Sequence, residues 1–274
     1  MTAHDMSTSG LMAGKKGLIM GVANDKSIAW GIAEALATAG AELAFTYQTE
    51  AFSRRVGPLA ASVGSDFTLP CDVASEDDLD QVFLALQERW QSLDFIVHAI
   101  AYSDKNELKG HYVDTSRENF RNTMDISCFS FTNVARRAAP LMTAGGSMIT
   151  LSYLGAERTL PNYNVMGVAK AALEASVRYL AADYGADGIR VNALSAGPMR
   201  TLAGSAIGGA RYVYRYTERS APLRRNLALE EVGRAGLYLA SDLSSGVTGE
   251  IMHVDGGFHA VAIPPAEESP AEND

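Results

Sequence analysis

Residues 17–31 read GLIMGVANDKSIAWG, and the expected fold follows from this stretch. Its apolar beginning, residues 17–22, is typical of a buried β-strand. Ser27 then stands at the position of a helix N-cap, and apolar residues recur at every fourth position from Ile28 until Gly40 ends the pattern. A strand, a short loop and a helix in this order predict the first unit of a parallel α/β sheet.

The same alternation continues along the 274 residues of the chain. Short apolar runs predict seven strands, at residues 17–22, 42–47, 67–70, 95–99, 147–152, 190–195 and 251–254. Further helical patterns occupy residues 75–90, 116–142, 163–182 and 229–240. We therefore expect a single-domain, Rossmann-type α/β fold over residues 14–262, with a doubly wound parallel sheet of about seven strands and helices on both faces. The terminal residues 1–13 and 263–274 are expected to be flexible.

One long segment interrupts the alternation. Residues 196–225 follow the sixth strand and are rich in glycine, alanine, arginine and tyrosine. Loops of more than about 15 residues in compact domains are usually functional, and ligands of open α/β sheets bind beyond the carboxyl ends of the strands. We therefore predict a helical substrate lid over residues 196–225.

Composition and charge exclude several classes of partner. The formal net charge of −9 repels a phosphate backbone, so nucleic acid is not expected as a partner. The sequence has no apolar run of about 18 residues for a membrane span and no secretory pattern at its N-terminus. Cys71 and Cys128 suit buried thiols better than a disulfide, and the five histidines show no metal-ligand spacing. We expect a cytoplasmic protein with no metal site and no membrane partner.

The loop at residues 21–27 is the expected site for the pyrophosphate of a dinucleotide. It joins the first strand to the first helix, where free backbone N–H groups and the positive helix end attract phosphate. The small residues Gly21 and Ala23 permit a close approach. The two glycines of this strand–helix turn, Gly21 and Gly31, fit a purely structural role equally well.

The end of the second strand is expected to contact the adenosine ribose. Gln48 stands there, and its neighbours at positions 47, 49 and 50 carry no positive charge for a 2′-phosphate. NADH is therefore favoured over NADPH, although Arg54 and Arg55 lie further along the chain.

The end of the third strand offers two residues for the adenine. Asp72 can accept a hydrogen bond from the adenine amino group, and Val73 can pack on the ring. A carboxylate at the start of the following helix is the structural alternative for Asp72.

Residues 163–170, YNVMGVAK, contain the expected reactive groups. Seven residues are about two helical turns, so Tyr163 and Lys170 are expected on one side of a helix, roughly 10 Å apart along its axis. The strand pattern and this lysine resemble the short-chain dehydrogenase/reductase superfamily. Its ordinary members have a tyrosine four residues before the lysine and a serine thirteen residues before that tyrosine. Here Met166 and Tyr153 occupy those two positions, so the ordinary carbonyl-reducing triad is missing.

This combination resembles the bacterial NADH-dependent enoyl-acyl-carrier-protein reductase family. The motifs that carry the resemblance lie at residues 21–31, 41–48, 151–158, 163–170, 195–202 and 253–258. The resemblance implies NADH-dependent reduction of the carbon–carbon double bond of a trans-2-enoyl thioester on an acyl carrier protein. In such a substrate, hydride goes to the β-carbon while negative charge develops on the carbonyl oxygen. The acid group must therefore lie further from the hydride, as the seven-residue spacing allows.

The resemblance gives each residue of the site an expected role. Tyr163 stabilises the enolate oxygen as a hydrogen-bond donor, Lys170 anchors the nicotinamide ribose, and Tyr153 lines the same pocket. Ala101 stands where the family often has glycine, and its methyl group narrows the space beside the nicotinamide. The expected cofactor contacts are Gly21, Ser27, Ile28, Gln48, Asp72, Val73, Ile100, Lys170, Met199 and Thr201. The expected substrate contacts are Ala101, Tyr153, Tyr163, Met166, Ala203 and Ile207.

The predicted lid also offers a surface for a partner. Arg211, Arg215 and Arg219 recur every four residues and would form one stripe on a helix. Acyl carrier proteins are acidic, so the stripe is a candidate dock, with a solvated helix face or a subunit contact as alternatives. The apolar segment 254–262, together with the resemblance, suggests packing in a homotetramer.

Two other functions are compatible with this fold. The first is a 3-oxoacyl or hydroxysteroid-type carbonyl reductase, which Met166 and Tyr153 disfavour. The second is a non-catalytic NAD-sensing protein, which would have little need for both Tyr153 and Tyr163 beside Lys170.

Overall fold

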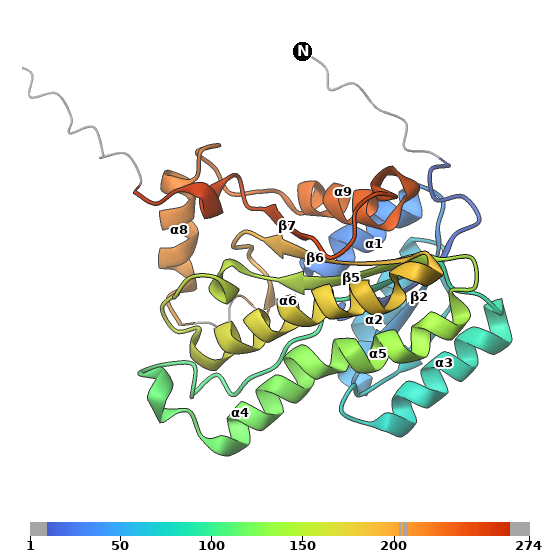
Figure 1. Ribbon diagram of the computed structural model, residues 1–274, viewed down its shortest axis with the longest axis horizontal. Coiled ribbons are helices and arrows are strands. Elements are labelled where there is room, and N and C mark those ends of the chain that lie inside the picture. Colours follow the sequence, from blue (N-terminus) through green and yellow to red (C-terminus); the bar gives the residue numbers. More distant parts are fainter. Residues whose placement is uncertain (1–9, 203, 205–207, 264–274) are drawn as a thin grey trace, which may run out of the picture.

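A seven-stranded sheet forms the centre of the molecule (Figure 1). The computed structural model describes residues 10–202, 204 and 208–263. The strands are β1 (Lys16–Met20), β2 (Glu42–Tyr47), β3 (Thr68–Pro70), β4 (Phe95–His98), β5 (Gly146–Ser152), β6 (Ile189–Ala196) and β7 (Ile251–Val254). Their order is β3-β2-β1-β4-β5-β6-β7, and every neighbouring pair is parallel. The seven predicted strands and the doubly wound topology are confirmed.

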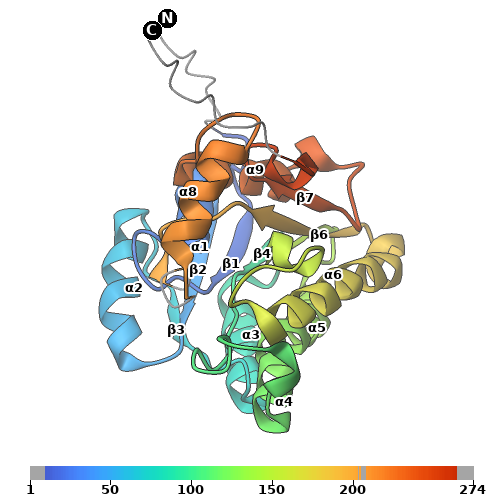
Figure 2. The ribbon, with the colours of Figure 1, turned by 90° about the vertical axis from the view of Figure 1, so that its left-hand side faces the viewer.

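Helices cover both faces of the sheet (Figures 1 and 2). One face carries α1 (Ile28–Thr38), α2 (Glu50–Ser62) and α9 (Leu229–Ala240). The other carries α3 (Glu76–Trp90), α4 (Arg117–Met124), α5 (Ser130–Ala138) and α6 (Asn164–Tyr184). Each face has its own apolar core, and successive strand residues alternate between the two. Leu18 packs with α3, α5 and α6, whereas Ile19 packs with α1, α2 and α9. The short 3₁₀-helices are η1 (Tyr112–Asp114), η3 (Ala139–Leu141), η4 (Leu154–Ala156), η5 (Gly185–Asp187), η6 (Asp242–Ser244) and η7 (Phe258–Ala260).

The helix expected over residues 116–142 is present as an unbroken helical run from Arg117 to Leu141, but it is irregular, because a π-turn joins α4 to α5 and the 3₁₀-helix η3 ends the run. The π-turn η2 (Asp125–Phe129) separates α4 from α5. At its end, the Ser130 hydroxyl donates to the Ile126 carbonyl at 2.7 Å. A serine side chain that bonds to a carbonyl four residues back bends a helix. The helix α2 was not predicted from the sequence, because it contains Gly57 and Pro58, residues that disfavour helix interiors.

Glycine brings α1 and α9 into close contact. A Cβ atom at Gly31 would lie 2.5 Å from Leu229 Cγ, and one at Gly233 would lie 2.3 Å from the Gly31 carbonyl oxygen. The structural alternative for Gly31 is therefore the correct one.

The predicted lid region contains the helix α8 (Ala210–Ser220), which stands off the end of the sheet (Figures 1 and 2). Residues 203 and 205–207 lie outside the described part, and so do residues 1–9 and 264–274 of the expected flexible ends. Within the N-terminal stretch, Met12 is buried and donates its N–H to the Ala39 carbonyl at 2.8 Å.

Candidate active site

Six of the expected site residues follow six consecutive strands. Because β1 to β6 are parallel, their carboxyl ends meet at one edge of the sheet, and the residues that follow them line this edge. These residues, from the one that follows β1 to the one that follows β6, are Gly21, Gln48, Asp72, Ile100, Tyr153 and Met199. The edge includes the switch point between β1 and β4, where the order of the strands reverses.

The loop after β1 is shaped for an anion at the start of α1. Ser27 is the N-cap residue, as predicted, but its hydroxyl turns back and accepts hydrogen bonds from the N–H groups of Ala23 (3.0 Å) and Asn24 (3.1 Å). Among the described residues, no side chain caps the first turn of α1. Ile28 is the first residue of that turn. The free N–H groups of a first turn fit a phosphate.

Gly21 has a positive φ of 98°, and its role includes packing. A Cβ atom there would lie 2.1 Å from the Ala99 carbonyl oxygen, so a side chain would push the end of β1 away from the end of β4.

Gln48 and Asp72 meet across the ends of β2 and β3. The Gln48 amide donates to Asp72 Oδ2 at 3.0 Å, while Asp72 Oδ1 accepts from the Ala74 N–H at 3.0 Å. The cap of α3 is Ser75, so Asp72 belongs to the loop before the helix. Val73 is buried beside it.

Two tyrosine rings meet at the end of β5. Tyr153 and Tyr163 pack edge to face, with ring centroids 5.2 Å apart and an interplanar angle of 73°. Tyr163 is 6% exposed. Burial raises the pKa of Tyr153 to about 12, and burial, with Tyr153 and Glu174 nearby, raises the pKa of Tyr163 well above its usual range. Both phenols therefore keep their protons at neutral pH and can donate hydrogen bonds.

The backbone on either side of Tyr163 is strained. Asn162 and Asn164 have positive φ angles of 56° and 29°. The Asn162 amide donates to the Gly208 carbonyl at 2.7 Å, and the Asn164 amide donates to the Gly110 carbonyl at 3.3 Å. Tyr163 is consequently the N-cap residue of α6, one position before the helix, which corrects the expectation that it lies inside the helix.

Lys170 is buried on α6 and faces the end of β5. Its ammonium donates to the Leu151 carbonyl at 2.6 Å, and its side chain is 6% exposed. Burial lowers the pKa of Lys170 to about 8, against the opposing effects of Cys128 and Glu174. Met166 lies between Tyr163 and Lys170, the two expected reactive residues, in the sequence and packs in one apolar cluster with Tyr163 and Leu108.

His98, a buried histidine to which no role was assigned from the sequence, connects the end of β4 to β5 and to the residue that follows the π-turn. His98 Nδ1 lies 3.2 Å from Thr150 Oγ1 on β5, and Nε2 lies 2.9 Å from Ser130 Oγ after the π-turn. Because Ser130 gives its proton to the Ile126 carbonyl, its oxygen accepts from Nε2–H. Burial, followed by the nearby Lys170, lowers the pKa of His98 to about 3, so the imidazole is neutral. Only the fold reveals this role, because Thr150 and Ser130 are far from His98 in the sequence.

The π-turn also holds the loop after β4. The Ser127 hydroxyl accepts from the Tyr102 N–H and donates to the Tyr102 carbonyl, both at 2.9 Å. Ala101, the neighbour of Tyr102, is exposed on this loop. π-turns occur often at functional sites, and this one fixes the position of an expected substrate contact.

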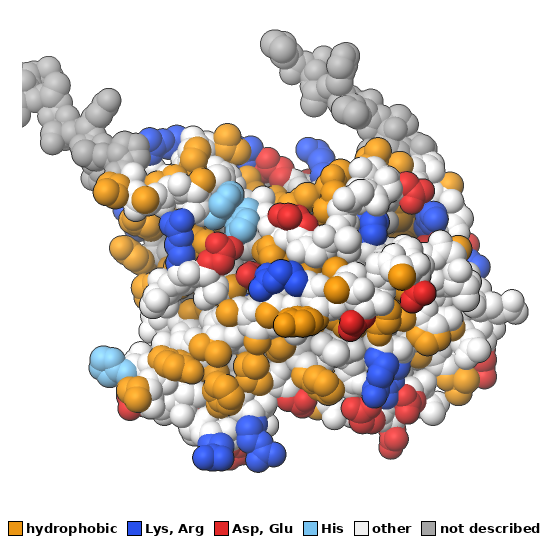
Figure 3. All heavy atoms as spheres, in the orientation of Figure 1, with side chains coloured by type: hydrophobic (Ala, Val, Ile, Leu, Met, Phe, Trp, Pro, Cys, Tyr) orange, Lys and Arg blue, Asp and Glu red, His pale blue; other side chains and the backbone are white. Residues whose placement is uncertain are grey.

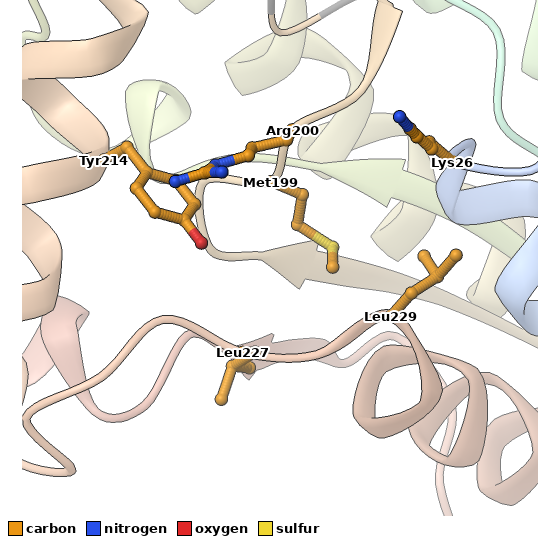
Figure 4. Close-up of a pocket in the computed structure, with 6 residues that line it drawn as sticks. All are labelled: Lys26, Met199, Arg200, Tyr214, Leu227 and Leu229. Atoms are coloured by element: carbon orange, nitrogen blue, oxygen red, sulfur yellow. The ribbon is translucent and has the colours of Figure 1, made fainter.

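A cavity of about 200 Å³ lies between the loop after β6 and the start of α9 (Figure 4). Met199, an expected cofactor contact, lines it, and the Arg200 guanidinium stacks on the Tyr214 ring of α8 at 4.7 Å. Thr201 Oγ1 accepts from the Gly204 N–H at 2.9 Å. Ala203 and Ile207, the expected acyl contacts, lie outside the described residues.

Residues 10–202, 204 and 208–263 contain neither a cluster of metal-ligating side chains nor a helix that could cross a membrane. No group of three or more His, Cys, Asp or Glu side chains in these ranges is placed to hold a metal ion. Within the same ranges, no helix has the length and apolar character that crossing a bilayer requires. Cys71 and Cys128 are buried free thiols, as predicted.

Known proteins share both the sequence and the fold. The family model described as enoyl-(acyl carrier protein) reductase matches residues 21–259. The chain is 64% identical to enoyl-acyl-carrier-protein reductase (NADH) 2 of Rhizobium meliloti (strain 1021), over 94% of this chain and 97% of that protein. It is 53% identical to the corresponding FabI of Rickettsia bellii (strain RML369-C), over 93% of this chain and 97% of that protein.

Solved structures agree with this result. The FabI structure from Candidatus Liberibacter asiaticus has a TM-score of 0.92 and 56% identity, covering 94% of this chain and 100% of that chain. The enoyl-acyl-carrier-protein reductase of Anaplasma phagocytophilum, solved in complex with NAD, has a TM-score of 0.92 and 59% identity, covering 95% of this chain and 100% of that chain. The chain therefore belongs to the enoyl-(acyl carrier protein) reductase family.

Proposed function

We propose that this chain catalyses the NADH-dependent reduction of the carbon–carbon double bond of trans-2-enoyl-acyl-carrier-protein to acyl-acyl-carrier-protein. The names of its relatives in Rhizobium meliloti and Rickettsia bellii state an enoyl-acyl-carrier-protein reductase that uses NADH. The observation that carries the proposal is the contact between the Tyr153 and Tyr163 rings at the end of β5. Met166 stands where a carbonyl reductase of the same superfamily has its tyrosine.

The described residues fit a dinucleotide along the carboxyl edge of the sheet. The uncapped first turn of α1, with its loop held by Ser27, suits the pyrophosphate. Gln48, Asp72 and Val73 suit the adenosine, and the Lys170 ammonium suits the nicotinamide ribose. NADH, when bound, supplies the hydride. The other residues that we propose as cofactor contacts are Gly21, Ile28, Ile100, Met199 and Thr201.

The substrate is held by the tyrosines and the loops beside them. Tyr163 donates a hydrogen bond to the thioester carbonyl oxygen, where negative charge develops when hydride reaches the β-carbon, and protonation of this enolate at the α-carbon completes the reduction. Its raised pKa suits this role, because the phenol stays protonated and no phenolate repels the developing charge. Tyr153, Ala101 and Met166 line the space for the acyl group, with Ala203 and Ile207 as the proposed contacts of the lid.

The test is NADH absorbance in the presence of different thioesters. We expect oxidation of NADH with crotonyl thioester and none with a 3-oxoacyl thioester. Turnover of the 3-oxoacyl thioester alone would show a carbonyl reductase instead, and no turnover of either would favour a protein that only senses NAD. NADPH should be the poorer cofactor, because Gln48 stands where a 2′-phosphate would need a cation and Arg54 is ion-paired with Glu50 at 3.6 Å.

The α8 arginines are the proposed dock for the acidic acyl carrier protein. Arg211, Arg215 and Arg219 are exposed and lie on one helix, as predicted. The helix stands beyond the end of the sheet that bears the active-site loops (Figure 2). A positive stripe on a chain of net charge −9 supports this role through electrostatic complementarity.

A second copy of the chain is the proposed partner of the α5–α6 face, within a homotetramer. Figure 3 shows hydrophobic side chains gathered over α4, α5 and α6. Phe129 is 50% exposed and Tyr179 is 76% exposed on this face, and apolar side chains of this size favour burial in an interface. Sedimentation equilibrium should give four times the chain mass of 29.2 kDa, and Tyr179→Glu should lower it. A wild-type monomer would contradict the assembly.

The two free thiols suit the reducing cytoplasm, where we propose that the enzyme acts.

A further inference from the structure

Three successive residues at the end of β5 are each attached to α6 or to its N-cap. The Leu151 carbonyl accepts from Lys170 Nζ at 2.6 Å, the Ser152 hydroxyl donates to Glu174 Oε1, and the Tyr153 ring packs on Tyr163. Lys170 and Glu174 are four residues apart, so they lie one turn apart on the same side of α6. The proposed mechanism uses the first and third of these contacts. The second one, between Ser152 and Glu174, has no role in it.

The Glu174 carboxyl group is buried, and burial disfavours its charged form. It is 7% exposed, and a charge at such a position requires a partner. The charged and titratable groups that surround Glu174 or Lys170 come from every neighbouring element. They are Lys170 and Arg178 on α6, Glu157 beside η4, His253 on β7, Cys128 in η2, His98 on β4 and Tyr163. The partner of His253 is Glu157 and not Glu174, because His253 Nε2 lies 2.7 Å from Glu157 Oε1.

We propose that Glu174 is a positioning residue of the reductase reaction. Its carboxylate keeps Lys170 protonated, and its hydrogen bond with Ser152 holds the end of β5, which precedes Tyr153. The inference rests on the proposed function, since it gives Lys170 the task of binding the nicotinamide ribose. Glu174 touches neither the substrate nor the cofactor in this account. It acts through Lys170 and Ser152.

The charge state of Lys170 depends on the groups that surround its ammonium. Burial lowers the pKa of Lys170 to about 8, while Cys128 and Glu174 oppose this effect. Burial also raises the pKa of the Cys128 thiol, so Cys128 acts on Lys170 as an anion only at high pH and is uncharged at neutral pH. Burial raises the pKa of Glu174 above its usual value, and the hydrogen bond from Ser152 opposes this rise. The Ser152 hydroxyl thus favours the charged form of the carboxylate on which Lys170 depends.

The substitution Glu174→Gln separates charge from structure. Glutamine keeps an oxygen that can accept from Ser152, but it removes the negative charge. The readout is the dissociation constant of NADH, followed by cofactor fluorescence between about pH 6 and pH 9 without an enoyl substrate. In the wild type, NADH binding should weaken as pH rises through about 8, where Lys170 loses its proton.

In Glu174→Gln, we expect this weakening to begin about one pH unit lower, which is a tenfold loss of affinity above pH 8 and little change at pH 6. The matched control is Glu157→Gln, which removes a charge from the same cluster but leaves Glu174 in place. Its NADH profile should follow that of the wild type. A loss of affinity that is equal at every pH would show a merely structural role and overturn the proposal.

A second pair of variants covers the case in which Glu174→Gln does not fold. Glu174→Asp and Glu174→Asn have side chains of the same size and differ in charge, so only the Asn variant should show the displaced profile. Superimposable profiles of these two variants would overturn the proposal, and so would a wild-type affinity that does not fall at high pH. If the wild-type enzyme reduces crotonyl thioester but the NADH-binding profiles of the two variants are superimposable, only the role of Glu174 is refuted. If the wild-type enzyme does not reduce crotonyl thioester, the proposed function itself is refuted.

Discussion

Tyr163 is held in place by its neighbours more than by the helix that follows it. Two asparagines with positive φ angles flank it, Tyr153 packs against its ring, and the Gly155 backbone lies beneath it. Strained backbone at a functional residue persists only where the surroundings enforce it. The phenol is therefore fixed before the substrate arrives.

The substitution Tyr163→Phe should remove the hydrogen bond to the thioester oxygen and leave the packing intact. We expect kcat for crotonyl thioester to fall about 100-fold, as for the loss of one oxyanion donor, with little change in KM or in the melting temperature. Steady-state kinetics and thermal unfolding measure the three quantities. A variant with wild-type kcat would remove Tyr163 from the chemistry.

Gly155→Ala tests whether the position of Tyr163 matters. The new Cβ atom would lie 2.3 Å from Tyr163 Cδ1, so the ring must move and kcat should fall more than 10-fold. Gly57→Ala is the matched control, because a Cβ atom on α2 meets nothing within 4 Å and should leave kcat unchanged. That control should also stabilise the fold by about 0.5–1 kcal/mol, since alanine favours helix. Equal activities of the two variants would contradict the role of Gly155.

At the scale of the elements, the sequence predicted regular structure well and its interruptions poorly. All seven strands follow from apolar runs, because buried parallel strands leave that pattern directly in the sequence. The π-turn between α4 and α5 does not, because it depends on Ser130 and on His98, a residue of β4. In the site, the edge-lining residues could be predicted from the strand ends. The Gln48–Asp72 hydrogen bond and Glu174 could not, because these contacts join residues far apart in the sequence.

His98 should make the stability of the protein depend on pH. The unfolded chain protonates this imidazole near pH 6.5, whereas the folded protein keeps it neutral down to about pH 3. The folded state binds fewer protons in this window, so stability falls as the pH drops below 6.5. Between pH 6.5 and pH 5 the loss should be about 1.6 kcal/mol.

Urea unfolding of the wild type and of His98→Gln at pH 5, 6 and 7 measures this contribution. The variant is expected to be less stable at pH 7, because its contacts with Thr150 and Ser130 are altered, but to lose less stability on acidification. Parallel pH dependences would show that His98 does not contribute.

At the scale of the whole molecule, the proposed reaction site and the proposed carrier dock on α8 lie on the same side. The loops after β5 and β6 lead to the tyrosine pair and to α8 respectively, so a carrier bound to α8 would lie close to the thioester site (Figures 1 and 2). The fold thereby joins the proposed chemistry to the proposed partner.

Charge reversal on α8 tests the dock. Arg211→Glu together with Arg215→Glu should raise KM for the carrier-linked enoyl substrate about 10-fold or more and leave KM for the coenzyme A thioester almost unchanged. Arg234→Glu, an exposed arginine on α9, is the control and should affect neither substrate. Equal increases for both substrates would exclude α8 as the carrier dock.

The most direct test of the central claim is the fate of labelled hydride in a mixture of substrates. Equal amounts of crotonyl and acetoacetyl thioesters are incubated with the enzyme and NADH deuterated at the transferred position, and the products are analysed by mass spectrometry and NMR. We predict butyryl thioester with deuterium at the β-carbon, while acetoacetyl thioester is recovered unchanged. Deuterated 3-hydroxybutyryl thioester in place of labelled butyryl thioester would contradict the account.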